Sequence, residues 1–199
     1  MKGFYFATDD TLSFKGSLSD VQAAVKAKVE VIQYRCKNGS VKFICQQARE
    51  LKQAAQGALF IINDRIDVAL AVDADGVHLG QEDMPCDLAR KILGPDKIIG
   101  ISTHNIEQAR IAQEQGASYI GIGAVFVTNT KAGVMPLGIK MVEQVVRQVS
   151  IPVVAIGGLN LENARQVIDA GVDAVCAISA VVTKQDVAQE ILKFQRMFK

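Results

Sequence analysis

Short apolar runs alternate with amphipathic segments along the whole chain. Apolar runs bounded by glycine or polar clusters are typical of buried strands, and apolar positions spaced three and four residues apart are typical of helices. The pattern predicts strands at residues 3–8, 29–35, 59–62, 76–80, 97–103, 119–126, 152–158 and 173–179. It predicts helices at about 19–28, 40–56, 66–74, 86–93, 106–115, 138–149, 161–170 and 185–198.

The order of these elements indicates the fold class. The strand and helix units follow one another without a linker, a low-complexity tract or a break in composition. Such alternation is typical of a parallel sheet covered by helices. We therefore predict an α/β fold, a single-domain (β/α)8 TIM barrel over residues 1–199. An open doubly wound sheet is the alternative, but it would leave two edges to protect and usually needs fewer units.

The composition limits the classes of ligand that the protein is expected to bind. The chain has 22 basic and 21 acidic residues, which argues against a nucleic-acid or membrane surface and favours small-molecule ligands met by local charges. No apolar run approaches a membrane span, although 49% of residues are hydrophobic, so the strands are expected to be buried on both faces. Scattered cysteines and the absence of a secretory signal predict reduced thiols and a cytoplasmic location. The sequence is compatible with a homo-oligomer.

Two polar clusters follow neighbouring strands. Asp64 comes directly after the third predicted strand, and Asp83 follows the fourth. The carboxyl ends of parallel strands meet at one edge of a sheet, so the two carboxylates are expected to face one another across a cleft. That arrangement suits a hard divalent cation completed by waters and phosphate oxygens. Either residue alone would more readily be a helix N-cap, and only the pair favours a metal site.

The second strand ends in alternating polar side chains. Gln33, Arg35 and Lys37 are spaced two apart, so they share a face. Two cations and an amide near a metal would hold a diphosphate, and the alternative is a solvated basic strand end. After the fifth strand, Ser102 is a candidate donor to a phosphate or a base. His104 is more plausible as a loop residue or helix cap than as a catalytic group.

A second anion site is expected near the end of the chain. The loop after the sixth strand carries hydroxyls and an ammonium at Thr128, Thr130 and Lys131. Gly157 and Gly158 end the seventh strand, and Ser179 ends the eighth. Barrels commonly bind a phosphate at these two strand ends. The sequence therefore predicts a metal-assisted diphosphate near strands two to four and a monophosphate near strands seven and eight.

Seven motifs occur in the order and spacing of one family. They are QYRCK, IINDR, DGVHLGQED, GISTHN, TNTK, AIGGLN and AISA. Together they cover nearly the whole chain, and the chain resembles thiamin phosphate synthase. The resemblance implies a (β/α)8 barrel that joins hydroxymethylpyrimidine diphosphate to thiazole phosphate with Mg²⁺, giving thiamin phosphate and releasing pyrophosphate.

The resemblance also implies residue roles. The pyrimidine diphosphate site would comprise Gln33, Tyr34, Arg35, Cys36, Lys37, Asn63, Ser102 and Lys131. The magnesium ligands would be Asp64 and Asp83. The thiazole phosphate site would comprise Thr128, Asn129, Thr130, Gly158, Ile178 and Ser179. Arg35, Lys37 and Lys131 would be the catalytic cations that stabilise the leaving pyrophosphate.

Three positions depart from the family pattern. Cys36 stands where the family usually has glutamate, and Ala124 and Val127 stand where it often has prolines. None of them removes a charged contact to phosphate or metal, but they leave the loop geometry open. There are two alternative functions: a thiazole tautomerase of the same superfamily, which usually has histidine where Ala124 sits, and a non-catalytic barrel that binds a thiamin precursor or product as a regulator.

Overall fold

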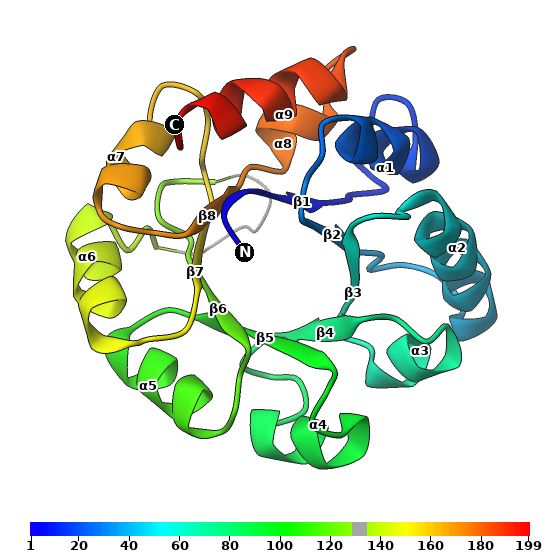
Figure 1. The fold of residues 1–199 in the computed structure, drawn as a ribbon, viewed down its shortest axis with the longest axis horizontal. Helices are drawn as coiled ribbons and strands as arrows, with labels where there is room; N and C mark the ends of the chain where they lie inside the picture. Colours follow the sequence, from blue (N-terminus) through cyan, green and yellow to red (C-terminus); the bar gives the residue numbers. More distant parts are fainter. Residues whose placement is uncertain (129–134) are drawn as a thin grey trace.

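The computed structural model describes residues 1–128 and 135–199 (Figure 1). Parallel strands pair in chain order from β1 to β8, and β8 pairs with β1 to close a barrel. The helices lie outside this ring in Figure 1. The predicted (β/α)8 barrel is therefore confirmed.

The bounds of the elements follow the predicted alternation closely. The strands are β1 Gly3–Ala7, β2 Val31–Tyr34, β3 Leu59–Asn63, β4 Gly76–Leu79, β5 Ile98–Thr103, β6 Tyr119–Ile122, β7 Val153–Ile156 and β8 Ala174–Cys176. The helices are α1 Ser17–Lys26, α2 Val41–Ala54, α3 Ile66–Ala71, α4 Cys86–Leu93, α5 Ile106–Glu114, α6 Ile139–Gln148, α7 Ala164–Asp169, α8 Ser179–Val182 and α9 Val187–Arg196.

The main differences from prediction lie at the end of β6 and after β8. Strand β6 ends at Ile122 instead of continuing to residue 126, and the peptide between Gly123 and Ala124 is cis. The chain nevertheless stays beside β7, because the amides of Val125 and Phe126 donate to β7 and Gly157 carbonyls at 3.0 Å each. The short helix α8 was not predicted, because its apolar residues continue the apolar run of β8 and give no separate helical period.

The barrel has two apolar layers. The outer layer packs the helices against the strands, and the inner layer fills the barrel. The inner layer consists of Tyr5, Ala7, Val31, Ile61, Tyr119, Val154, Ala174 and Cys176. Gly100 makes room for one of these side chains, because a Cβ added there would lie 2.1 Å from Cζ of Tyr119. The Tyr119 ring can therefore extend into the barrel only where β5 carries no side chain.

The amino ends of the strands are fixed by side-chain acceptors. Asp75 precedes β4 and accepts from the amide of Phe60 in β3 at 2.7 Å. Asp173 precedes β8 and accepts from the amide of Val153 in β7 at 2.8 Å. Both residues return a backbone hydrogen bond to the same partner, so each pair of strands begins with a closed ring of two hydrogen bonds. This end of the barrel is therefore built for stability.

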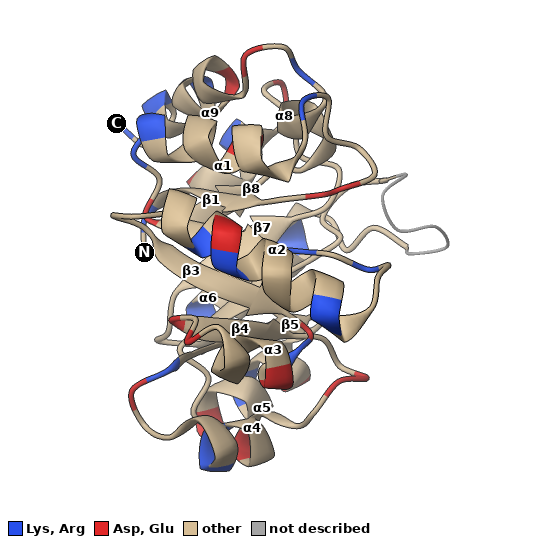
Figure 2. Ribbon diagram, turned by 90° about the vertical axis from the view of Figure 1, so that its right-hand side faces the viewer, with Lys and Arg blue, Asp and Glu red and all other residues tan. Residues whose placement is uncertain are grey.

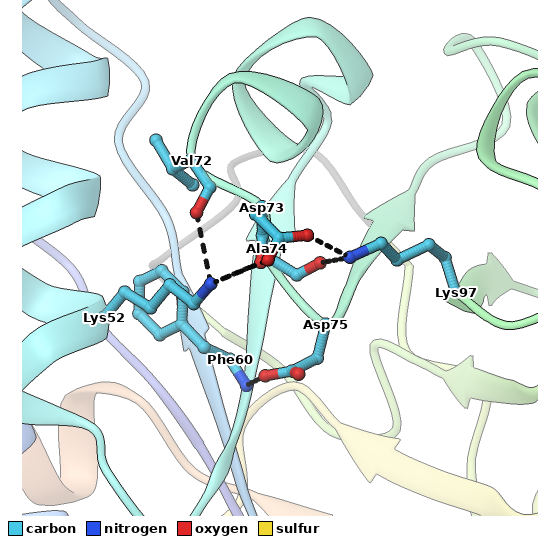
Figure 3. Close-up of polar contacts among 7 residues, drawn as sticks. All are labelled: Lys52, Phe60, Val72, Asp73, Ala74, Asp75 and Lys97. Atoms are coloured by element: carbon cyan, nitrogen blue, oxygen red, sulfur yellow. Dashed lines mark hydrogen bonds and ion pairs between the residues drawn. The ribbon is translucent and has the colours of Figure 1, made fainter.

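Two lysines hold the turn between α3 and β4 (Figure 3). Lys97 Nζ donates to Asp73 Oδ1 at 2.7 Å and to the Ala74 carbonyl at 2.8 Å. Lys52 Nζ donates to the carbonyls of Val72, at 3.2 Å, and Asp73. Asp73 adopts a left-handed backbone with φ of 52°, and these contacts occupy the carbonyls around it. The turn therefore delivers Asp75 to the start of β4 in a fixed position.

Both signs of charge are distributed over the helices and loops seen in Figure 2. Among the described residues, no helix combines the length and apolar character needed to cross a membrane.

We predict that Asp75→Ala lowers the free energy of unfolding by about 1–3 kcal/mol, because the buried amide of Phe60 loses its acceptor. Asp75→Asn is the matched control, since it retains an oxygen in the same place and should preserve most of the stability. Urea denaturation of both variants provides the measurement. Equal stability of the alanine variant and the wild type would show that this acceptor does not hold the strand pair.

Candidate active site

A cavity of about 340 Å³ lies at the carboxyl ends of the strands. Its volume falls in the range of small-molecule sites. The predicted site residues that line it are Gln33, Arg35, Lys37, Asn63, Asp64, Asp83, Ser102, Thr128, Gly158, Ile178 and Ser179. Barrel closure thus brings together residues from both of the predicted anion sites.

Some predicted residues lie elsewhere. The hydroxyl of Tyr34 hydrogen-bonds to Gln47 Oε1 of α2 at 2.9 Å, and the ring packs in the outer layer. Cys36 does not line the cavity either, and its Sγ contacts the Asn38 carbonyl at 3.0 Å. Both point away because alternate residues of a strand face opposite sides. Asn129, Thr130 and Lys131 lie outside the described residues.

The two aspartates form a carboxylate pair and do not cap helices. Arg65 and Pro85 occupy the N-cap positions of α3 and α4, so the capping interpretation is wrong for both aspartates. Asp64 has a left-handed backbone with φ of 61° directly after β3. Asp83 Oδ2 accepts from the amide of Gly80 at 2.6 Å, which holds the turn after β4.

The pair is electrostatically unfavourable when both carboxyls are ionised. Partial burial, and then the charge of the adjacent Asp83, raise the pKa of the Asp64 carboxyl to about 6. Lys37 and Arg35 act in the opposite direction and lower this pKa. The two carboxyls are close enough to share a hydrogen bond, so a dication between them would relieve their repulsion.

The donor set fits Mg²⁺ better than Zn²⁺. Within residues 1–128 and 135–199, no cluster of three or more His, Cys, Asp or Glu side chains could hold a metal. Mg²⁺ usually takes only one or two carboxylates and keeps sites for water and substrate phosphate, whereas structural zinc uses four nitrogen or sulfur ligands. Asp64 and Asp83 would be its protein ligands.

Arg35 is held by a partner that the sequence analysis missed. Its guanidinium forms an ion pair with Asp9, whose side chain is 7% exposed. Its backbone amide donates to Thr8 Oγ1 at 3.0 Å. Asp9 directly follows the predicted strand 3–8 and lies two residues beyond the end of β1, so examining that strand end in the same way as the others would have found it. The pair fixes Arg35 at the cavity wall without leaving its charge unbalanced.

The floor of the cavity is a series of hydrogen-bonded polar side chains, of which Gln33 and Ser102 were predicted as site residues and Tyr5, Tyr119 and His78 were missed. Gln33 Nε2 donates to the Tyr5 hydroxyl at 3.0 Å, and the hydroxyls of Tyr5 and Tyr119 are 2.7 Å apart. His78 lies 2.9 Å from both the Tyr119 hydroxyl and Ser102 Oγ. Burial lowers the pKa of His78 to about 4, so the imidazole is neutral near pH 7. A histidine inside an otherwise apolar strand was the available signal.

The opposite wall contains the glycine pair and α8. Gly158 has a φ of 66°, and a Cβ there would lie 2.3 Å from the Val127 carbonyl oxygen. Gly157 similarly leaves no space for a Cβ beside Ala124. The glycines therefore let the segment after β6 lie against the end of β7. Ile178 and Ser179, where α8 begins, line the same cavity.

Metal-free Asp64→Asn is predicted to be more stable than the wild type at pH 8, by up to about 1 kcal/mol after solvent screening. The folded pKa of about 6 lies above the ordinary value of 3.8, so wild-type stability falls as the pH rises from about 4 to 6. The gain should vanish below pH 4, where both states are protonated. Thermal unfolding at both pH values provides the measurement, and a gain that is independent of pH would contradict the proposed repulsion.

The chain is similar in sequence to proteins of one family. The family model described as thiamine monophosphate synthase matches residues 4–181. The thiamine-phosphate synthase of Methanosarcina barkeri is 50% identical over 201 residues, covering 98% of this chain and 90% of that protein. That of Shouchella clausii is 49% identical over 170 residues, covering 84% and 81%.

A solved structure extends the similarity to the fold. Thiamine phosphate pyrophosphorylase from Pyrococcus furiosus matches with a TM-score of 0.90 and 40% identity, covering 98% of this chain and 95% of that one. The chain therefore belongs to the thiamin phosphate synthase family and is a transferase of thiamin biosynthesis.

Proposed function

We propose that the protein transfers the pyrimidinylmethyl group of 4-amino-2-methyl-5-hydroxymethylpyrimidine diphosphate to the nitrogen of 4-methyl-5-(2-hydroxyethyl)thiazole phosphate, or of its carboxylated form. The products are thiamin phosphate and pyrophosphate. The observation that carries the proposal is that Arg35, Lys37 and the Asp64–Asp83 pair line the same cavity as Gly158 and Ser179. One cavity thus offers a place for a metal diphosphate and a place for a monophosphate.

The diphosphate would lie against the ends of β2, β3 and β4. Arg35 offers a planar set of donors that the ion pair with Asp9 holds in place, and Lys37 offers a mobile ammonium. Asn63 adds an amide on the neighbouring strand. Mg²⁺ on Asp64 and Asp83 would supply charge neutralisation for the leaving pyrophosphate. These groups would face the oxygens on which negative charge grows during the reaction.

The reaction proposed is ionisation followed by capture. The C–O bond to the diphosphate breaks, its electron pair leaves with pyrophosphate, and the amino substituent of the ring stabilises the resulting pyrimidine methylene cation. The thiazole nitrogen then donates its lone pair to that carbon. No protein nucleophile or general base is needed, so the task of the side chains is to stabilise charge and to align the two substrates.

The thiazole phosphate would lie at the ends of β7 and β8. Gly158 and Ser179 line the cavity there, and their backbone amides would be the donors to this phosphate. Such amides are suited to a phosphate. Thr128 lines the cavity between the two places. The two substrates would therefore be aligned because their anionic ends are held at opposite walls of the cavity.

Incubation of the purified protein with both substrates and Mg²⁺ tests this function. We expect thiamin phosphate and pyrophosphate in equal amounts, and neither product when Mg²⁺ is removed by a chelator. Metal-independent isomerisation of the thiazole phosphate alone would instead indicate a tautomerase. Binding without turnover would indicate a regulator.

Asp83→Asn is predicted to abolish Mg²⁺-dependent turnover while the fold is retained. The substitution removes a metal ligand but keeps an oxygen that can accept from the Gly80 amide. Asp87→Asn is the matched control, because that aspartate lies on α4 in an exposed pair with Lys91. Steady-state rates over a Mg²⁺ titration provide the measurement. Wild-type rates and metal affinity in Asp83→Asn would exclude the carboxylate pair as the metal site.

Lys37→Met is predicted to lower the single-turnover rate at saturating substrates about a hundredfold, with a smaller loss of diphosphate affinity. The reason is that a cation beside the leaving group interacts more strongly as negative charge develops. Lys42→Met, at the exposed start of α2, is the control. An unchanged rate at saturating substrates, with only weaker diphosphate binding, would show that Lys37 stabilises the bound substrate and not the transition state. The same behaviour is expected of Lys131, which lies outside the described residues.

A further inference from the structure

The polar floor of the cavity crosses the barrel from β2 to β5. It connects the side chains of Gln33, Tyr5, Tyr119, His78 and Ser102 in that order, through four hydrogen bonds of 2.7–3.0 Å. Its two ends, Gln33 and Ser102, line the cavity and were assigned to the pyrimidine substrate. The three residues between them have no role in the reaction proposed above.

The direction of this chain follows from the donors and acceptors available. Gln33 Nε2 donates to the hydroxyl of Tyr5 at 3.0 Å. An amide nitrogen cannot accept, so the Tyr5 proton has one acceptor within reach, the hydroxyl oxygen of Tyr119. Tyr119 must then donate its own proton to the next group along, which is Nδ1 of His78.

The tautomer of His78 is thereby fixed. Nδ1 accepts from Tyr119, so the single proton of the neutral ring lies on Nε2 and is donated to Ser102 Oγ. The Ser102 hydroxyl accepts this bond, and its proton is free to be donated into the cavity. At the other end, Gln33 Oε1 has no partner among the described residues and is not sealed from the cavity.

We propose that Tyr5, Tyr119 and His78 are positioning residues. They fix the direction of the hydrogen bonds in the cavity floor, that is, its polarity, so that Gln33 presents only an acceptor and Ser102 only a donor to the substrate. This polarity selects an aminopyrimidine. Its exocyclic amino group donates to Gln33 Oε1, and a ring nitrogen accepts from Ser102. A 4-oxo ring would instead place its carbonyl oxygen against Gln33 Oε1. The inference rests on the proposed function and adds its substrate discrimination.

The backbone is shaped around this chain. A Cβ at Gly100 would overlap the Tyr119 ring, with its hydroxyl oxygen 2.4 Å away. A Cβ at Gly121 would lie 3.2 Å from Cε1 of His78. Two adjacent strands therefore carry no side chain where the chain crosses the barrel. Reversing one hydrogen bond would require reversing all four, because each hydroxyl has a single proton, and so the amide of Gln33 cannot turn independently.

The protein has two histidines, His78 and His104. Nitrogen NMR of their imidazoles tests the direction of the hydrogen bonds directly. His78 is expected to carry its proton on Nε2. His104 serves as the internal reference with the opposite tautomer, because its Nδ1 faces the Gly123 carbonyl, which can only accept. Tyr5→Phe, which interrupts the hydrogen bonds before Tyr119, and Tyr119→Phe, which removes the donor to Nδ1, should both weaken this preference of His78. A proton on Nδ1 of His78 in the wild type would overturn the proposal.

Calorimetry without the second substrate tests the discrimination. The probes are 4-amino-2-methyl-5-hydroxymethylpyrimidine diphosphate and its 4-oxo counterpart, with Mg²⁺. The wild type should prefer the amino compound about a hundredfold, and Tyr119→Phe should reduce this preference at least about tenfold. An unchanged preference in a folded Tyr119→Phe variant, or a wild-type preference for the oxo compound, would overturn the inference.

The turnover assay separates this inference from the proposed function. If thiamin phosphate forms but the preference does not depend on Tyr119, only the positioning role fails. If the wild type binds neither pyrimidine diphosphate and makes no thiamin phosphate, the proposed function and this inference fail together.

Discussion

Closure of the parallel strands in chain order is the constraint on which the cavity depends. In a closed barrel every second side chain of each strand points into one enclosed space, and all the carboxyl ends open at one mouth. Gln33 on β2 and Ser102 on β5 are far apart in sequence, yet both line one cavity. The space is limited, so a large inward side chain such as Tyr119 requires a glycine, Gly100, on the strand beside it.

Charge in the cavity is arranged in pairs that are balanced to different degrees. Arg35 is compensated by Asp9 before any ligand arrives, which keeps the guanidinium in place at a small electrostatic cost. Asp64 and Asp83 are not fully compensated, as the raised pKa of Asp64 indicates. A site with excess negative charge on one side and donors on the other favours a complex of a cation with a polyanion over either ion alone. Metal and diphosphate would therefore bind cooperatively.

Sequence reasoning predicted the barrel and the alternation of Gln33, Arg35 and Lys37, because both follow from local periodicity. It also brought Asp64 and Asp83 together, because parallel strands place their carboxyl ends at one edge. It missed Tyr5, His78 and Tyr119, which lie within strands and find their partners across the barrel. Which polar residues inside strands meet depends on the register of all eight strands, and single-strand patterns do not contain that information. Helix α8 was missed because its apolar residues continue those of β8.

We infer that the cavity has a metal–diphosphate end at β2 to β4 and a monophosphate end at β7 and β8. A crystal structure with Mn²⁺ and pyrophosphate, using anomalous scattering to locate the metal, tests it most directly. The account predicts the metal between the carboxylates of Asp64 and Asp83, with pyrophosphate against Arg35 and Lys37. Pyrophosphate bound at Gly158 and Ser179, or a metal away from the two aspartates, would contradict it.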